Sequence, residues 1–483
     1  MNALEGRAAV AETHVSVVFF AGDRACKLKK PVAMGFLDFS TREAREAACR
    51  REVELNRRLA PDVYLGVADI DGPDGRPCDH LVVMRRMPEH RRLSTLVRTG
   101  ADVAEGVRQV ARQIAGFHER VPTSAEIASA GSAASVGRNW EDNFAQMAPF
   151  VGPVLDRAPA DRAACLARRY LAGRGPLFER RIASGLVRDG HGDLLADDIF
   201  LLDDGPRILD CIEFDDRLRH GDVLADVAFL AMDLERLGAP DLAARFLGWY
   251  REFSGHPHPV TLAEHYVAYR AHVRAKVACL RHAQGDPDAA REAAAFLAQA
   301  LRHLERGRVR LVLVGGRPGT GKTTLAAALA DATGWSLLSS DEVRRDLGRN
   351  AGPAAYGAGA YSDESVTVTY RELVARARTA LGLGEPVVLD ASWRHEAWRA
   401  LARRVAAETA SELVELRCEA PDGLAAARIA ARRAAGAGLS DATVAVSAAM
   451  AADFAPWPEA LAVDTAVEPG RSLASALAAL RGS

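Results

Sequence analysis

Residues 310–323, Arg-Leu-Val-Leu-Val-Gly-Gly-Arg-Pro-Gly-Thr-Gly-Lys-Thr, decide the fold of the C-terminal part of the chain. They join an apolar strand to a glycine-rich turn that fits the pattern GxxxxGK[ST] from Gly316 to Thr323, and a helical pattern follows. In such a turn, glycines let successive backbone N–H groups point at phosphate oxygens, and the helix N-terminus adds positive potential. The stretch therefore predicts a phosphate-binding loop between a strand and a helix.

This loop also predicts its ligands, ATP and Mg²⁺. We expect Lys322 to reach the β and γ phosphates and the Thr323 hydroxyl to contact the metal ion. Asp390, the acid that ends the apolar run PVVLD, is the candidate for a second metal contact. The predicted nucleotide-binding residues of the loop are Gly316, Gly319, Thr320, Gly321, Lys322, Thr323 and Thr324.

The two halves of the chain differ in their pattern. After the loop, strand-like runs at 336–340, 386–390 and 413–418 alternate with helical segments, which is typical of an α/β domain with a parallel sheet. In the first half, strand-like runs come first and helical segments follow, which predicts a two-lobed α+β domain, and the small residues of 125–135 predict a loop. We therefore expect a two-lobed α+β domain over 1–290, a linker helix over 291–307 and a P-loop domain over 308–483.

A second group of acids lies at residues 191–215. His191-Gly-Asp193 precedes Asp198, and the strand RILDCIEF that follows contains Asp210 and Glu213. Phosphoryl transfer needs a carboxylate beside the attacking hydroxyl and oxygen ligands for Mg²⁺, and this spacing can supply both. The segment resembles the catalytic loop HGDxxxxN of the aminoglycoside phosphotransferase family. The resemblance implies that Asp193 is the catalytic base and that Asp198, which replaces the family's Asn, and Asp210 bind metal, with Glu213 as the alternative to Asp210.

Upstream residues fit the same resemblance. A strand near residue 27 carries three of the five lysines, and a helix near residue 52 carries an acid that can pair with one of them. In kinases such a lysine holds the α and β phosphates and the glutamate steadies it. Strand alternation favours Lys29 with Glu52, and Lys27 is the alternative. The segment 81–89 would be the hinge that holds adenine, and residues 12–16 stand where a glycine-rich loop is expected but lack its glycines.

From residue 308 to 479 the chain resembles P-loop small-molecule kinases such as gluconate kinase, chloramphenicol phosphotransferase and the zeta toxins. Asp341, with Arg344 after it, follows the second strand, and Arg428 and Arg432 follow the fourth. The resemblance implies that Asp341 positions or deprotonates the acceptor hydroxyl and that the two arginines close over the nucleotide phosphates. The alternatives are that Asp341 is a helix N-cap and that the arginines form a solvated helix face.

As a whole, the chain resembles bacterial fusions of an aminoglycoside phosphotransferase-like kinase domain with a P-loop domain of the AAA group. The resemblance implies an ATP-dependent phosphotransferase with two nucleotide sites that acts on a small hydroxylated acceptor. The alternative is a P-loop ATPase or kinase that a non-catalytic, kinase-like sensing domain regulates. A third reading, a toxin-like kinase, depends on the zeta toxins alone.

Composition limits the partners and the compartment. The 483 residues carry 62 basic and 64 acidic side chains, so nucleic acid is not the expected partner, and no apolar run is long enough to span a membrane. Seven scattered cysteines without a CxxC pair predict reduced thiols and a cytoplasmic protein. Arg270, Arg274 and Lys276 lie on one predicted helix, where they would line an acceptor pocket or form the basic outer face of a packed helix. The oligomeric state and the acceptor's identity have no signal in the sequence.

Overall fold

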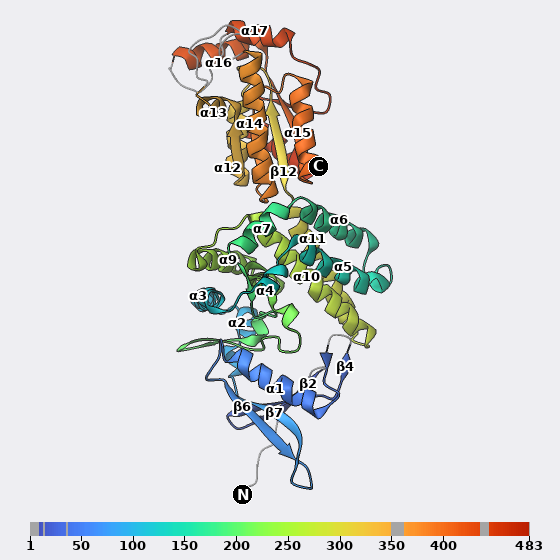
Figure 1. Ribbon diagram of the computed structural model, residues 1–483. Helices are drawn as coiled ribbons and strands as arrows, with labels where there is room; N and C mark the ends of the chain where they lie inside the picture. Colours follow the sequence, from blue (N-terminus) through green and yellow to red (C-terminus); the bar gives the residue numbers. More distant parts are fainter. Residues whose placement is uncertain (1–8, 13–14, 35–36, 349–361, 435–443, 483) are drawn as a thin grey trace. The chain divides into compact units, whose positions relative to one another are not determined.

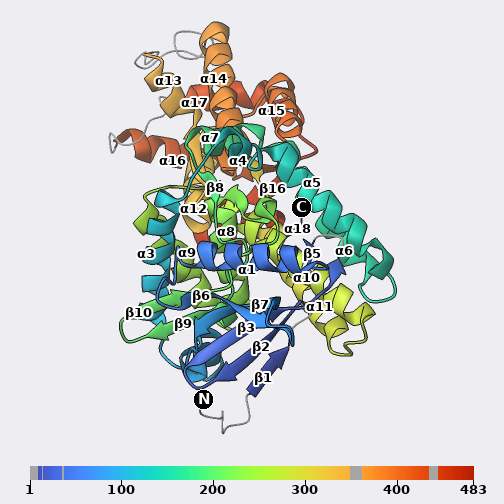
Figure 2. The ribbon, with the colours of Figure 1, turned by 60° about the horizontal axis from the view of Figure 1, so that its bottom comes forward.

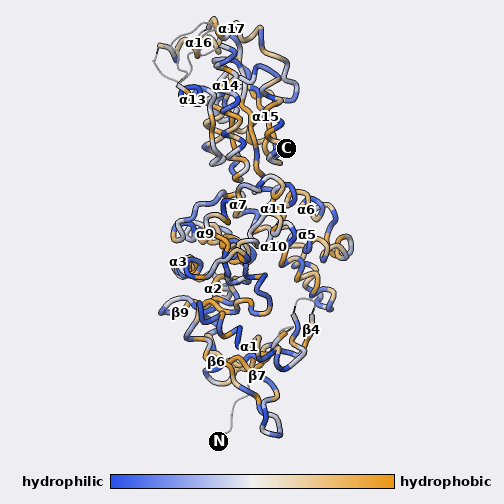
Figure 3. The backbone as a smooth tube through the Cα atoms, viewed as in Figure 1, coloured by the Kyte–Doolittle hydropathy of each residue, from blue (hydrophilic) through white to orange (hydrophobic). Residues whose placement is uncertain are grey.

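The computed structural model describes residues 9–12, 15–34, 37–348, 362–434 and 444–482 (Figure 1). The chain divides into two compact units. The first contains Met1–Ala160, Phe178–His258 and Ala263–His303, and the second contains Asp161–Leu177, Pro259–Leu262 and Leu304–Ser483. Hydrophobic and hydrophilic residues are interspersed along the helices (Figure 3), and within the described ranges none of them meets the length and apolarity that a membrane span requires.

A five-stranded antiparallel sheet opens the first unit, in the order β1-β2-β3-β7-β6. Its strands are β1 (Ala9–Glu12), β2 (Ser16–Ala21), β3 (Arg24–Lys29), β6 (Tyr64–Asp71) and β7 (Pro77–Arg85). Helix α1 (Arg42–Asn56) packs on β6 and β7 (Figure 2), and its Cys49 and Val53 share a buried cluster with Val82 of β7. This packing holds α1 beside the sheet in which β3 carries Lys27 and Lys29. A short pair, β4 (Ala33–Met34) and β5 (Leu37–Asp38), precedes α1.

The rest of the first half is mostly helical. Its helices are α2 (Leu93–Arg98), α3 (Ala104–Arg120), α4 (Ala125–Ser129), α5 (Ala133–Met147), α6 (Arg157–Ala172), α7 (Gly175–Ala183), α8 (Val223–Arg236), α9 (Pro240–Ser254), α10 (Val260–Ala283) and α11 (Ala289–Arg306). The hairpin of β9 (Ile199–Leu202) and β10 (Gly205–Ile208) and the pair of β8 (Val187–Asp189) and β11 (His220–Asp222) hold the acid-bearing loops. The loop expected at 125–135 is wrong, because Ser124 and Ser132 cap the N-termini of α4 and α5.

Helix α11 corresponds to the segment that was expected to form a linker helix, and its buried side packs against other helices of the first unit. Gln299 donates a hydrogen bond to the Met232 carbonyl oxygen at 2.9 Å. His303 contacts Glu235 through Nε2 at 2.9 Å and Glu264 through Nδ1 at 2.5 Å. These contacts fix α11 against α8 and α10 in the first unit.

The second unit is built on a five-stranded parallel sheet in the order β13-β14-β12-β15-β16. The strands are β12 (Arg310–Gly315), β13 (Ser336–Ser339), β14 (Val387–Asp390), β15 (Glu412–Glu419) and β16 (Leu461–Asp464). The helices are α12 (Lys322–Thr333), α13 (Ser340–Asp346), α14 (Asp363–Gly382), α15 (Glu396–Glu408), α16 (Asp422–Ala434), α17 (Val444–Ala452) and α18 (Pro469–Gly482). Every residue of β12 is buried, as expected for the central strand of a parallel sheet. The predicted fold class, a two-lobed α+β domain followed by an α/β P-loop domain, is confirmed.

A segment from the first half of the sequence completes this second unit. Arg174, only 1% exposed, donates hydrogen bonds to the carbonyl oxygens of Thr409, at 2.9 Å, and Leu381. Thr261 donates to the Gly384 carbonyl oxygen at 2.6 Å. The carbonyl groups concerned end α15 and α14, where a helix leaves acceptors without partners of its own. Residues 161–177 and 259–262 are therefore part of the P-loop unit, although they are remote from it in sequence.

Candidate active sites

The turn between β12 and α12 has the backbone geometry of a phosphate-binding loop. Gly319 and Gly321 have φ angles of 83° and 81°, in the left-handed region that favours glycine. A Cβ on Gly319 would lie 2.4 Å from the Ala425 carbonyl oxygen, so no other residue fits there without movement of the backbone. Gly321 precedes Lys322, the first residue of α12. The turn thus directs backbone N–H groups and a helix N-terminus to one place.

Oxygen ligands suited to Mg²⁺ lie beside this turn. The Thr323 hydroxyl donates a hydrogen bond to Asp390 Oδ2 at 2.7 Å. Asp390 Oδ1 is buried and has no hydrogen-bond partner among the described residues. Burial raises the pKa of Asp390, and the nearby Lys322 ammonium opposes that rise. A buried carboxylate oxygen without a partner next to a threonine hydroxyl fits a hard divalent cation, so Thr323 and Asp390 are the residues that would hold Mg²⁺.

Arg428 of α16 lies against the glycine turn. Its Nη2 donates to the Thr465 carbonyl oxygen at 2.7 Å, and its buried Nη1 has no partner in the described part of the chain. The same Nη1 lies 3.4 Å from the position that a Cβ on Gly321 would take. Arg432, one turn further along α16, also has buried nitrogens, Nε and Nη2, for which no described atom is a partner. These unused donors favour the phosphate-closing role over that of a solvated face.

Asp341 lies at the start of α13, where the parallel register brings the ends of β13 and β14 together. The N-cap of α13 is Ser339, whose hydroxyl accepts a hydrogen bond from the Asp341 amide. The capping interpretation of Asp341 is therefore wrong. Its carboxylate instead pairs with Arg344 at 2.7 Å, on the same sheet edge as Asp390.

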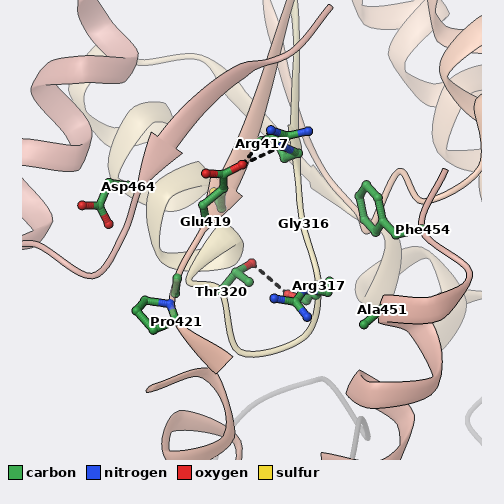
Figure 4. A pocket seen from close by; sticks show the side chains of 11 residues that line it. Gly316, Arg317, Thr320, Arg417, Glu419, Pro421, Ala451, Phe454 and Asp464 are labelled. Atoms are coloured by element: carbon green, nitrogen blue, oxygen red, sulfur yellow. Dashed lines mark hydrogen bonds and ion pairs between the residues drawn. The ribbon is translucent and has the colours of Figure 1, made fainter. Parts of the chain in front are cut away.

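A cavity of about 640 Å³ borders the glycine turn (Figure 4). Its lining includes Gly316, Arg317 and Thr320 of the turn, the end of β15 around Glu419, and Phe454. Arg417 and Glu419 form an ion pair at 2.6 Å on its wall, and Thr320 donates to the Arg317 carbonyl oxygen at 2.8 Å. Arg417 and Glu419 belong to the run RCEAP, which resembles the P-loop kinases, but the sequence indicates no role for their side chains or for Phe454.

In the first unit, two lysines share one buried glutamate. Lys29 Nζ lies 2.7 Å from Glu52 Oε2, and Lys27 Nζ lies 3.0 Å from Glu52 Oε1. Lys27 also pairs with Asp210 at 2.6 Å, and Lys29 pairs with Glu213. The sequence alternatives Lys27 and Lys29 therefore both belong to this network, as do Asp210 and Glu213. Burial lowers the pKa of each lysine, but the surrounding carboxylates outweigh that effect and keep both lysines charged.

Three acids of the predicted catalytic loop influence one another. Burial, with Asp210 nearby, raises the pKa of Asp193 to about 6, while Arg274 and Arg270 oppose the rise. Burial, with Asp210 and Asp193 nearby, raises the pKa of Asp198 well above its ordinary value. Asp210 has a left-handed φ of 63°, which is uncommon for a residue other than glycine, and its pKa is lowered chiefly by Lys27. The fold thus brings the three predicted acids into one electrostatic cluster.

Asp226 fixes the loop that carries Asp193. Its carboxylate accepts hydrogen bonds from the backbone amides of His191 and Gly192, each at 2.8 Å, and contacts His118 Nε2 at 3.0 Å. Burial opposes ionisation of Asp226, but these partners hold its pKa below its ordinary range. These contacts link the loop to α8, which carries Asp226, and to α3, which carries His118. The glycine-free segment 12–16 is described only in part, because residues 13 and 14 lie outside the described residues.

Comparison with known proteins extends these observations. Residues 311–457 match the AAA domain family model. The chain is 45% identical over 472 residues to two uncharacterized proteins, Rv2004c of Mycobacterium tuberculosis and Mb2027c of Mycobacterium bovis. Each alignment covers 97% of this chain and 94% of the relative. Among solved structures, a gluconokinase from Sinorhizobium meliloti 1021 covers 36% of this chain and 92% of its own, at 19% identity and a TM-score of 0.28. A choline/ethanolamine kinase family protein from Mesorhizobium loti covers 62% of this chain and 93% of its own, at 16% identity and a TM-score of 0.40.

The fold and the glycine turn define the class: an α+β domain is joined to an α/β domain whose P-loop lies within the match to the AAA domain family. It belongs to the same family as the mycobacterial proteins Rv2004c and Mb2027c, with which it aligns over nearly its whole length.

Proposed function

We propose that the protein is an ATP-dependent phosphotransferase with two nucleotide sites, one in each domain, that uses Mg²⁺ and acts on a small hydroxylated acceptor in the cytoplasm. The observation that carries this proposal is that each domain collects the same three components. These are a lysine for phosphate, oxygen ligands for a metal ion, and a separate carboxylate for the acceptor hydroxyl.

In the P-loop domain, Lys322 and the glycine turn bind phosphate, Arg428 and Arg432 close over it, and Thr323 and Asp390 would hold Mg²⁺. Asp341 accepts the proton of the acceptor hydroxyl. The acceptor oxygen forms a bond to the γ-phosphorus of ATP while the bond from that phosphorus to ADP breaks, and Mg²⁺ supplies charge neutralisation.

In the kinase-like domain, Lys29, steadied by Glu52, binds phosphate, and Asp210 and Asp198 would hold Mg²⁺. Asp193 takes the proton of the acceptor hydroxyl. Its pKa of about 6 suits a base that works near neutral pH. Each domain moves a γ-phosphoryl group in its own reaction, or one domain acts on the product of the other.

The second candidate is a regulatory role for the first domain, which would bind a ligand and control the P-loop site without catalysis. Two observations favour it: an acid, Asp198, stands where the aminoglycoside phosphotransferase pattern has a neutral Asn, and Lys27 and Lys29 are both engaged by acids.

ADP release by the full chain, measured with sugars, nucleosides, aminoglycosides and phosphorylated sugars as acceptors, tests both candidates. We expect Asp193→Asn and Lys322→Ala each to remove a different part of acceptor-dependent turnover. If Asp193→Asn leaves all turnover unchanged while Lys322→Ala removes it, the first domain is not catalytic. If the wild-type chain shows no Mg²⁺-dependent turnover with any acceptor, the phosphotransferase proposal is wrong.

A further inference from the structure

The kinase-like domain places two ammonium groups where kinases need one. Lys27 and Lys29 are two residues apart on β3, so their side chains project from the same face of the strand. Each contacts a different oxygen of Glu52, whose side chain is fully buried. One carboxylate thus contacts two cations, and Asp210 and Glu213 are the second partners of Lys27 and Lys29.

The two lysines differ in their access to a ligand. Lys29 is 2% exposed, lies 5.0 Å from the centre of the Phe39 ring, and is held by Glu213 as well as by Glu52. Lys27 is 14% exposed, and its outer partner is Asp210, whose side chain is 48% exposed. The more accessible ammonium therefore lies next to the residue that is expected to bind metal.

This arrangement would allow an exchange of partners when a nucleotide binds. If Asp210 became a ligand of Mg²⁺, its carboxylate would be less available to Lys27, and the ammonium could then contact phosphate. Lys27 is 2.6 Å from Asp210, so the ammonium already lies beside the metal ligand. The segment 12–16 lacks the glycines whose backbone amides cover phosphates in many kinases, and a second lysine can supply the missing positive charge.

We propose that Lys27 is a second phosphate-contacting lysine of the kinase-like domain, which Asp210 holds until Mg²⁺-nucleotide binds. The inference depends on the proposed nucleotide site in this domain. It assigns phosphate recognition to a two-lysine clamp, Lys27 and Lys29, centred on Glu52.

Nucleotide binding to the full chain tests this proposal, in a Lys322→Ala background that weakens the P-loop site. Titration calorimetry with Mg-ATP and with adenosine separates phosphate recognition from base recognition. We expect Lys27→Ala to weaken Mg-ATP binding about tenfold or more while adenosine binding stays unchanged. Lys27→Arg should restore most of the lost affinity, because it returns the positive charge. Lys30→Ala is the matched control, since Lys30 lies on the same segment but pairs with Glu12.

The possible failures are distinguishable. If the Lys322→Ala chain binds no Mg-ATP at all, the nucleotide site of the first domain is wrong and this inference goes with it. If the chain binds Mg-ATP and Lys27→Ala has no effect while Lys29→Ala abolishes binding, only the role of Lys27 is wrong. Equal losses for Mg-ATP and adenosine would show a structural role and would overturn phosphate contact. If Lys27→Ala does not fold, Lys27→Gln and Lys27→Arg give the same comparison between a neutral and a charged side chain.

Discussion

Replacement of Gly173 by Ala tests the conclusion that residues 161–177 belong to the P-loop unit. A Cβ on Gly173 would lie 1.9 Å from the Thr409 carbonyl oxygen and 2.6 Å from its carbon. Both contacts are far inside normal van der Waals distance, and both atoms are backbone, which moves only with its helix. Such overpacking costs about 1–3 kcal/mol. The shift would also disturb the 2.9 Å hydrogen bond from Arg174 to the same oxygen, at a further cost of about 1 kcal/mol.

We therefore expect Gly173→Ala to lower the stability of the P-loop unit by about 2–4 kcal/mol, which is a fall of roughly 5–10 °C in its unfolding temperature. Tryptophan fluorescence during thermal unfolding can follow this unit, because Trp335, Trp393, Trp398 and Trp457 all lie in it. Gly175→Ala is the matched control, since nothing lies within 4 Å of its added Cβ, and we expect a change of about 0.5 kcal/mol or less. If Gly173→Ala unfolds within about 1 °C of wild type, segment 161–177 does not pack against Thr409 and the reasoning fails.

Three further predictions concern the two sites. In the Lys322→Ala chain, acceptor-dependent turnover should fall as pH drops through about 6, because protonation of Asp193 removes the base; a rate that is constant from pH 5 to pH 8 would contradict this. Thr323→Ala should raise the Mg²⁺ concentration that half-saturates the P-loop reaction about tenfold, with Thr324→Ala as the neighbouring comparison in a Mg²⁺ titration. Asp226→Ala should cost about 3–5 kcal/mol in urea unfolding, because two buried amides and His118 lose their partner. Because the folded-state pKa of Asp226 is depressed, its carboxylate stabilises the wild-type fold above the ordinary pKa of Asp, and this stabilisation is lost as pH falls. If Asp226→Ala leaves the free energy of unfolding unchanged at neutral pH, Asp226 does not have this role.

The sequence predicted the P-loop unit well because its signals are local. The apolar strand, the glycine spacing and the lysine lie within fourteen consecutive residues, and each is fixed by backbone geometry. The same is true of Asp390, which ends an apolar strand whose register with β12 follows from the parallel sheet. These features depend on which residues neighbour one another in sequence, so the pattern alone indicates them.

The choice between Lys27 and Lys29 could not be made from the sequence for a physical reason. Residues two apart on a strand share a face, so alternation places both lysines in the site or neither. Their ranking depends on which acids approach from another part of the chain, here Asp210 and Glu213, about 180 residues away. Only the fold supplies that information.

No pattern in the sequence indicates that residues 161–177 belong to the P-loop unit. Only five of the 62 basic residues are lysines, so arginine is common in this chain and its residue type does not show that Arg174 is buried.

The prediction of a loop at 125–135 was wrong for a related reason. Ser and Ala are common in loops, but Ser124 and Ser132 cap helices that Ile127, Val136 and Trp140 anchor in the core.

The two proposed nucleotide sites bind phosphate by different physical means, and this difference bears on how they work together. In the P-loop domain, backbone N–H groups at the turn supply much of the attraction, and they need no release from a carboxylate before they bind. In the kinase-like domain, the cations are lysines that already pair with Asp210 and Glu213. There a nucleotide would have to compete with those acids, and Mg²⁺ would assist by taking Asp210 as a ligand. On this proposal the kinase-like site couples metal and nucleotide binding more tightly than the P-loop site, whether its role is catalysis or regulation.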